Sequence, residues 1–511
     1  MSSPTGTSLP SALPQSSLTH SASQSASSPQ HTTTLTEDPH AKIRRNIRDY
    51  VLEDLNRDMI MTTVVCLHAA VARRSYGNER RFLCPPPRVQ VEGPAWQMKR
   101  QVLTMSVVSE HGENLCEHAE PLDNNMTSTF KVLYISGEAR TKSVHLSLKI
   151  SEPSNVDSDP GHTWATFNSA PILAIAKPST TTSKMSTWIV SGKPVSLFHR
   201  IHSQTVSTRY MTMDHGTLSA SKDAWSAFSM HIVPPATDTP STGHLHPITH
   251  GCSIILTDTC SGISSPALIV RKVSKGTVCQ NDGNPVNQME KIALQRVNSD
   301  GTRCYLSTPR LAFARREDNM HLSATVSSEQ GESYALLFQP PHTRYQVENG
   351  VQIEVDDLDD HLCWTIVGIS KLQYTFFDAR ALNDSPPHMP ITPFPTLSTS
   401  PAYCEISNTL ELAGNFSYAD PTTGERLLLD IYIGSLGPLP ARTHQIEGVT
   451  GTTVAIVQMP SIGEVIRVLE KDTLKAAEGS SLPLLFIRPT DSVGYRMGPT
   501  MGLLRQALRV L

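Results

Sequence analysis

Residues 198–211 read FHRIHSQTVSTRYM, and the rest of the chain can be arranged around this stretch. Its apolar residues can anchor the segment on a β scaffold: Phe198, Ile201, Val206, Tyr210 and Met211. Between them lie cations and short hydrogen-bonding side chains, with no Asp or Glu: Arg200, His202, Ser203, Gln204, Thr205, Ser207, Thr208 and Arg209. Such a surface suits a nucleic-acid backbone, although Thr is also common in ordinary strands. The composition leaves a binding segment and a plain polar strand both open.

Length and charge limit what the chain can be. Its 511 residues suffice for about three domains of ordinary size. The formal net charge of −4 does not favour a general nucleic-acid binder, which is usually basic. The charge is uneven, however, because residues 41–210 hold 21 Lys and Arg against 15 Asp and Glu, a local net charge of +6. The sequence therefore predicts an electropositive face in the N-terminal half.

Cysteine usage and hydropathy indicate the compartment. The nine cysteines are scattered and form no C-x-x-C pair, which favours a reducing compartment over a disulfide framework. The sequence has no run of about 20 apolar residues that could span a membrane. Its first residues lack the basic and apolar pattern of a signal peptide. We therefore expect a soluble, intracellular protein.

Local patterns predict an all-β fold with a disordered tail. Residues 1–40 are mostly Ser, Thr, Pro, Gln and His and cannot form a core. Apolar residues at helical spacing from Ala41 to about Met61 predict a helix. This helix carries Arg44, Arg45 and Arg48, which form either a solvated basic face or a contact for phosphate or for localisation. Many short apolar segments separated by turns follow, as in all-β domains. Residues 385–396 are rich in proline and predict a linker.

A second candidate binding stretch is SYGNERRFLCPPPRV, residues 75–89. Gly77 and Asn78 predict a turn, and two arginines follow it. The prolines at 85–87 hold the next residues extended and cannot join a central ladder. A rigid turn that presents a guanidinium suits a base-edge contact, because Arg can bond guanine O6 and N7 together. Exposed Arg pairs are common, so this stretch alone is a weak signal.

The sequence gives no positive support for catalysis or for a cofactor. It contains no G-x-S-x-G, H-E-x-x-H or P-loop motif. A possible zinc pattern is the H-x-H-x₃-H spacing of His244, His246 and His250, with Cys252 nearby. Because this pattern lies in a Pro- and Thr-rich stretch, we expect a solvated loop instead. An acidic cluster at residues 356–360 lacks the central Gly and spaced Glu of a calcium loop, so we expect a charged turn.

Six motifs resemble, in the same order, those of the CSL family, the transcription factors of the Suppressor-of-Hairless or RBP-J type. They are SYGNERRFLCPPP, LYIS at Leu133, AKPS at Ala176, FHRIHSQTVSTRY, LIVRKV at Leu268 and CWTIVGISKLQYTFF at Cys363. The first and fourth are the most specific. The resemblance extends from about residue 45 to the C-terminus and is strongest to fungal members.

The resemblance implies an all-β architecture of three domains. These are a Rel-like N-terminal β-sandwich, a central β-trefoil and a C-terminal immunoglobulin-like domain of the Rel-like IPT/TIG type. Combined with the composition, it divides the chain into a tail at 1–40, an N-terminal domain at 41–180, the trefoil at 181–384, the linker at 385–396 and the C-terminal domain at 397–511.

The resemblance also implies a nuclear regulator that binds duplex DNA as a monomer at GTGGGAA-type sites. The N-terminal domain would read the major groove with Tyr76, Gly77, Asn78, Glu79, Arg80, Arg81 and Phe82. Arg81 matches the family's base-reading arginine. The trefoil would enter the minor groove with Arg200, His202, Ser203, Gln204 and Thr205. Lys177 and Ser179 match a segment that contacts the DNA backbone.

The chain departs from the family pattern at several positions. His202 stands where many members have Arg, which removes a fixed positive charge at neutral pH. Thr180, Thr181 and Thr182 replace a common lysine run, which predicts weaker and less salt-dependent binding. Transcriptional coregulators of unknown identity are expected as partners. Animal members of the family bind peptides on an apolar surface of the trefoil, and we do not assign that site to this chain. The alternative function is a trefoil interaction scaffold that has lost DNA binding.

Overall fold

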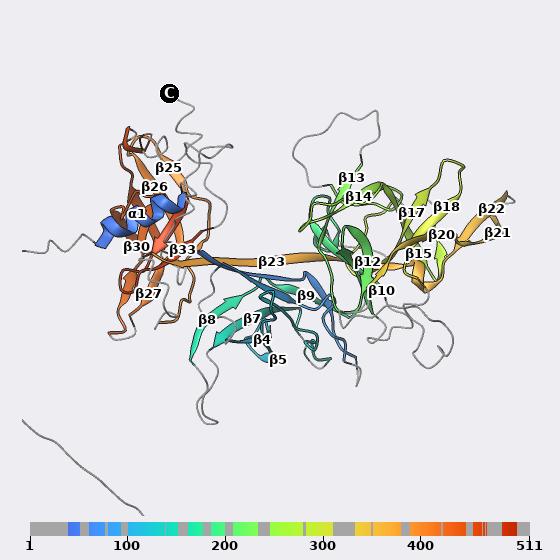
Figure 1. The fold of residues 1–511 in the computed structure, drawn as a ribbon, viewed down its shortest axis with the longest axis horizontal. Coiled ribbons are helices and arrows are strands. Elements are labelled where there is room, and N and C mark those ends of the chain that lie inside the picture. Colours follow the sequence, from blue (N-terminus) through green and yellow to red (C-terminus); the bar gives the residue numbers. More distant parts are fainter. Residues whose placement is uncertain are drawn as a thin grey trace, which may run out of the picture.

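The computed structural model is built almost entirely from β-strands. It describes residues 39–51, 61–76, 80–93, 101–137, 139, 141–151, 162–176, 185–199, 208–233, 246–279, 283–309, 333–348, 351–379, 389–420, 423–445, 453–461, 463–465, 467 and 483–497. Figure 1 shows the strands gathered into three bodies that share one long strand. The all-β prediction is therefore confirmed.

The N-terminal body is a sandwich of two sheets. Its strands are β1 (Met61–Ala69), β2 (Val71–Arg73), β3 (Arg88–Glu92), β4 (Val102–Ser109), β5 (Asn114–Glu120), β6 (Thr127–Thr129), β7 (Ser143–Ser151), β8 (Thr163–Asn168) and β9 (Ile172–Ile175). One sheet has the order β2-β9-β7-β4-β5, and β8 pairs with β7. The other sheet contains β1, β3 and β6. Alternate residues of β1, such as Val64 and Cys66, are fully buried between the sheets.

The central body is the β-trefoil. Its elements are η2 (Met185–Thr187), β10 (Pro194–His199), β11 (Arg209–Asp214), β12 (Thr217–Ser221), β13 (Phe228–Ile232), β14 (Ser253–Asp258), β15 (Leu268–Ser274), β16 (Thr277–Val278), β17 (Glu290–Val297), β18 (Arg303–Ser307), β19 (Ser333–Ala335), β20 (Leu337–Gln339), β21 (His342–Glu348), β22 (Val351–Asp357) and η6 (Asp360–Leu362). Leu197, Met211, Leu256 and Trp364 belong to one buried cluster at its centre.

The C-terminal body is a second sandwich. Its strands are β24 (Thr396–Leu397), β25 (Ala402–Cys404), β26 (Thr409–Asn415), β27 (Ser417–Ala419), β28 (Arg426–Leu428), β29 (Asp430–Ile433), β30 (Ala441–Gln445), β31 (Thr453–Gln458), β32 (Leu484–Ile487) and β33 (Val493–Arg496). One sheet contains β24, β26, β31 and β30, with β25 also on β26. The rings of Phe416 and Phe486 stack in its core with centroids 5.8 Å apart.

One strand, β23 (Trp364–Asp378), connects all three bodies. Its first residues pair with β10 and β17 of the trefoil. Its middle pairs with β1 from Ile369 to Phe377, and its end pairs with β33. A strand of 15 residues spans about 50 Å, and Figure 1 shows it running between the bodies. The three domains are therefore joined through continuous backbone pairing.

The N-terminal helix α1 (Pro39–Val51) packs against the C-terminal body. Ile43 and Ile47 are buried in a cluster that includes Tyr432 and Ile487. The Arg44 guanidinium donates to the Gly437 carbonyl over 3.1 Å, so this part of the predicted basic face is bonded to protein. The helix does not reach Met61 as predicted, because Met61 begins β1.

The proline-rich segment predicted as a linker is packed where the structure describes it, from residue 389. Ile391 is fully buried, and its backbone N–H donates to the Trp164 carbonyl over 2.7 Å. The Phe394 ring lies 4.6 Å from Tyr374 and 5.2 Å from Tyr495, centroid to centroid. From residue 389 on, this segment therefore packs apolar side chains against the N-terminal and C-terminal domains.

Candidate nucleic-acid interface

The stretch from Arg74 to Leu83, here called the arginine loop, is fastened at both ends to the segment 133–135. The Ser75 N–H donates to the Ile135 carbonyl over 3.0 Å, and the Leu83 N–H donates to the Leu133 carbonyl over 2.8 Å. The buried Ser75 hydroxyl accepts from the Arg81 N–H over 3.1 Å, which closes the base of the loop. Gly77, Asn78 and Glu79 lie outside the described residues. The backbone N–H groups of Ser75, Arg81 and Leu83 are thus satisfied within the protein.

A glycine permits this close contact. An added Cβ on Gly137 would lie 2.8 Å from the Ser75 carbonyl oxygen, closer than real Cβ contacts come. The backbone of Ser75 can therefore reach Ile135 only because position 137 has no side chain.

The described side chains of the arginine loop divide between solvent and protein. Tyr76 is 77% exposed, and Arg80 is also exposed. The Arg80 guanidinium carbon lies 5.3 Å from the ring centroid of Tyr134. Arg81 is half-buried, and its Nη1 donates to the Arg74 carbonyl over 3.4 Å. At 3.4 Å this hydrogen bond is a long one. Phe82 is half-buried and meets the Tyr134 ring edge-on.

Residues 198–211 include the paired ends of β10 and β11, which form a hairpin. Phe198 pairs with Tyr210, and His199 pairs with Arg209. Phe198, Tyr210 and Met211 are buried, so three of the predicted anchors are confirmed. Ile201, Val206, Ser207 and the proposed contacts lie at the connection, outside the described residues: Arg200, His202, Ser203, Gln204 and Thr205.

Two residues of this stretch are not part of a polar surface. Thr208 is 4% exposed and Arg209 is 8% exposed, which corrects their assignment to the binding surface. The reason is that β11 begins at Arg209 and pairs with β10, and Arg209 Nη1 donates to the Thr208 carbonyl over 3.2 Å.

His199 gives the base of the hairpin a neutral ring. It is 2% exposed, and its Nε2 lies 2.8 Å from the Thr308 hydroxyl. Burial first, and then the charge of Arg209, lower the pKa of His199 to about 3. The ring therefore stays uncharged near neutral pH.

The arginine loop and the hairpin share one hydrophobic cluster. Val71 comes just before the loop and Cys84 just after it, while Phe198 and Tyr210 bracket the hairpin connection, and all four belong to this cluster. The Cys84 sulfur lies 3.5 Å from the Tyr210 hydroxyl. The arginine loop and the hairpin connection lie more than 100 residues apart in sequence, yet both are anchored in this one cluster.

A third predicted segment leaves beside them. Strand β9 pairs in parallel with β2, with Arg73 opposite Ile175. Arg74 bonds to this strand end twice, through its N–H to the Ile175 carbonyl over 2.9 Å and its Nη2 to the Ala174 carbonyl over 3.2 Å. The chain therefore emerges at the exposed Ala176 next to the arginine loop. Lys177 and Ser179 follow, outside the described residues.

Trp225 locks the N-terminal domain to the trefoil. Its indole N–H donates to the Pro86 carbonyl over 3.0 Å, and its own carbonyl accepts from Arg88 over 3.2 Å. The Arg88 guanidinium also lies 5.5 Å from the Trp225 ring centroid. At the edge of the contact, Lys131 pairs with Asp223 over 2.8 Å. These contacts fix the relative orientation of the two domains.

The histidine pattern does not assemble a metal site in the described part of the chain. His250 is buried with its Nε2 3.4 Å from a Glu290 carboxylate oxygen, and His246 lies four residues before it. His244 lies outside the described residues. Within the ranges given above, no group of three His, Cys, Asp or Glu side chains is placed to hold a metal ion.

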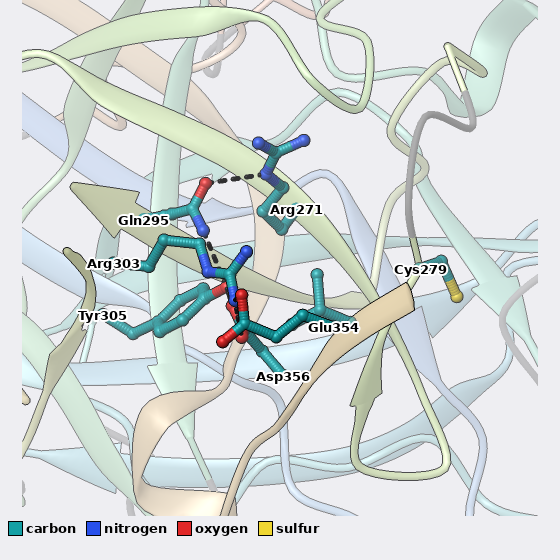
Figure 2. Close-up of a pocket in the computed structure, with 8 residues that line it drawn as sticks. Arg271, Cys279, Gln295, Arg303, Tyr305, Glu354 and Asp356 are labelled. Carbon is teal, nitrogen blue, oxygen red and sulfur yellow. Dashed lines mark hydrogen bonds and ion pairs between the residues drawn. The ribbon is translucent and has the colours of Figure 1, made fainter. Parts of the chain in front are cut away.

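Within the trefoil, Asp356 of the acidic cluster joins β22 to β18. Asp356 is 5% exposed and accepts from the Tyr305 hydroxyl over 2.5 Å. Arg303 Nη2 lies 2.9 Å from both Asp356 and Glu354. Figure 2 shows these groups meeting beside a cavity of about 130 Å³, with Arg271 above them. Asp356 is therefore a buried partner, not part of the charged turn expected at 356–360.

Sequence reasoning missed Ser75 and Tyr134 as supports of the arginine loop. Ser75 stands at the start of the first motif, and Tyr134 lies within the LYIS motif. Their motif positions were a signal, but no spacing rule connects residues about 60 apart.

Among the described residues, no helix has the length and apolar character needed to cross a membrane.

Two protein-family models match parts of this chain. A family model described as "LAG1, DNA binding" matches residues 64–187, and one described as "Beta-trefoil DNA-binding domain" matches residues 214–318. The arginine loop lies within the first range, and residues 198–211 lie between the two.

Similar whole proteins exist in animals and fungi. The recombining binding protein suppressor of hairless-like protein of Mus musculus is 31% identical over 391 residues, 70% of this chain and 67% of that protein. Its Homo sapiens counterpart is 29% identical over 427 residues, 77% of this chain and 71% of that protein. Transcription factor cbf11 of Schizosaccharomyces pombe is 28% identical over 394 residues, 74% of this chain and 61% of that protein.

Proposed function

Because the chain belongs to the CSL family of DNA-binding transcription factors, we propose that it acts in the nucleus as a monomer bound to GTGGGAA-type duplex sites. The arginine loop enters the major groove, and the connection between β10 and β11 enters the adjacent minor groove. A regulator of this kind acts through coregulators that it brings to the DNA.

The shared cluster carries this proposal. Val71, Cys84, Phe198 and Tyr210 tie the roots of both reading elements to one packed site, so a rigid duplex can meet both without rearrangement of the domains. The parallel pair β2 and β9 adds the segment from Ala176 at the same edge. Interfaces that are organised before binding lose less entropy on association.

Each element suits the chemistry of its groove. Arg81 can make paired hydrogen bonds to guanine O6 and N7, which only the major groove presents. Ser203 and Gln204 can reach the acceptors on the minor-groove floor, where readout mainly separates A·T from G·C pairs. Arg200 adds positive charge there, which a narrowed minor groove attracts. The G-rich and A·T parts of GTGGGAA are thus assigned to different domains.

An equilibrium titration tests this function. The full chain is titrated with a short duplex containing GTGGGAA and with one of the same base composition in scrambled order, at one fixed salt concentration. We expect at least about a thousandfold tighter binding to the first duplex and a stoichiometry of one chain per site. Equal affinities would support the interaction-scaffold alternative, and two chains per site would contradict the monomer.

Replacing Gln204 by alanine is expected to relax base preference at the A·T end of the site by about 1–3 kcal/mol and leave the G-rich part unchanged. Arg200→Ala or Arg200→His should weaken binding more severely, because charge near the phosphates is lost as well. All three variants should keep the wild-type melting temperature. Base-substituted duplexes measure the preference. An unfolded Gln204→Ala protein, or a shift at the guanines, would refute the minor-groove assignment.

Replacing Thr180, Thr181 and Thr182 by lysine is expected to tighten binding to all DNA. Each new phosphate contact should add about 0.9 to the magnitude of the slope of log K against log salt. The slope is measured on specific and scrambled duplexes, with the same triple change to glutamine as the uncharged control. An unchanged slope would place this segment away from the DNA backbone.

A further inference from the structure

Tyr134 touches two side chains of the arginine loop at once. The Arg80 guanidinium carbon lies 5.3 Å from its ring centroid. The Phe82 ring meets it edge-on, with centroids 6.3 Å apart and planes at 81°. The backbones of Phe82 and Tyr134 also form an isolated antiparallel bridge. Tyr134 therefore has its backbone and ring fixed by Phe82 while its ring receives Arg80.

These contacts separate the two arginines of the loop. Arg80 and Phe82 both lie against Tyr134, whereas Arg81 reaches the Arg74 carbonyl. Arg80 is exposed, and a cation at an exposed site gains modestly from an aromatic ring. A ring also restricts the guanidinium to one position, which reduces the rotamer freedom lost on binding.

We propose that Tyr134 is a positioning residue for DNA binding, which holds the Arg80 guanidinium ready for a phosphate while Arg81 reads bases. This inference rests on the proposed function, because it requires the arginine loop to meet DNA. Phe82 orients Tyr134, and Tyr134 orients Arg80. Tyr134 itself makes no contact with the DNA.

A double-mutant cycle tests this role on the GTGGGAA duplex with the full chain. Tyr134→Leu should weaken binding about twofold to fivefold. Tyr134→Phe keeps the ring and should bind as wild type. In an Arg80→Ala background, Tyr134→Leu should have no further effect, because the residue acts through Arg80. Tyr345→Leu, the same change at a tyrosine 68% exposed on β21, serves as the matched control and should bind as wild type.

The outcomes distinguish failure of the positioning role of Tyr134 from failure of the proposed DNA-binding function. If wild type shows no preference for the site, the proposed function fails and this inference falls with it. If wild type is specific but Tyr134→Leu costs the same with and without Arg80, Tyr134 is only structural. If Arg80→Ala alone has no effect, Arg80 makes no DNA contact. Either of the last two results overturns the positioning role and leaves the function standing.

Discussion

Replacing Ile391 by alanine is expected to lower the free energy of unfolding by about 2–5 kcal/mol. Ile391 is fully buried, in the cluster that spans the N-terminal and C-terminal bodies. Its N–H donates to the Trp164 carbonyl, and its carbonyl accepts from the Tyr495 hydroxyl over 2.8 Å. The truncated side chain would leave a cavity that these bonds prevent from closing. Guanidinium unfolding followed by tryptophan fluorescence measures the change.

Ile406→Ala provides the matched control. It deletes the same atoms at a position that is 101% exposed in the C-terminal domain, so its effect should stay within about 0.5 kcal/mol. If residues 385–396 form a simple linker, both variants will unfold like the wild type, and the packing described for this segment will be refuted.

Replacing Arg81 by alanine is expected to weaken binding to the GTGGGAA duplex by about 1–3 kcal/mol and binding to scrambled DNA much less. The loss is selective because a paired contact to guanine distinguishes sequences, whereas a phosphate contact does not. The fold should persist, since Arg81 is only half-buried and its Nη1 donates a long hydrogen bond to the Arg74 carbonyl over 3.4 Å. Parallel titrations on the two duplexes measure the difference.

Arg442→Ala is the control for charge alone. Arg442 is exposed on β30 in the C-terminal body, whereas the arginine loop belongs to the N-terminal body. Its removal should change neither titration beyond a small general effect. An equal loss for Arg81→Ala on both duplexes would mean that Arg81 touches only phosphate, and the major-groove assignment would be wrong.

Local sequence patterns predicted the all-β character of the fold. The apolar, β-branched run at 62–69 lies in β1, where burial alternates from Met61 to His68, since period-two patterning reports which face of a strand is covered. The same reasoning could not find the partner of α1, because burial of Ile43 and Ile47 does not indicate which body covers them. It also judged residues 385–396 by proline content and overlooked Ile391, whose partners lie more than 100 residues away.

The candidate site was predictable where motifs marked it and unpredictable where contacts are long-range. The arginine loop was identified from a turn and two arginines. In the sequence, Thr208 and Arg209 look as polar as the residues before them, but strand pairing buries both. Nothing in residues 75–89 indicates that Cys84 meets Tyr210, or that Trp225 holds the two domains together. Those contacts depend on tertiary packing, which local composition does not encode.

An unbiased selection from random duplex DNA with the purified full chain tests the central claim most directly. The account predicts enrichment of GTGGGAA-type sequences by the wild type. The guanine positions should lose preference in Arg81→Ala and the A·T end should lose preference in Gln204→Ala. Recovery of unenriched DNA by a folded wild-type chain, or enrichment of an unrelated sequence that both variants leave unchanged, would contradict it.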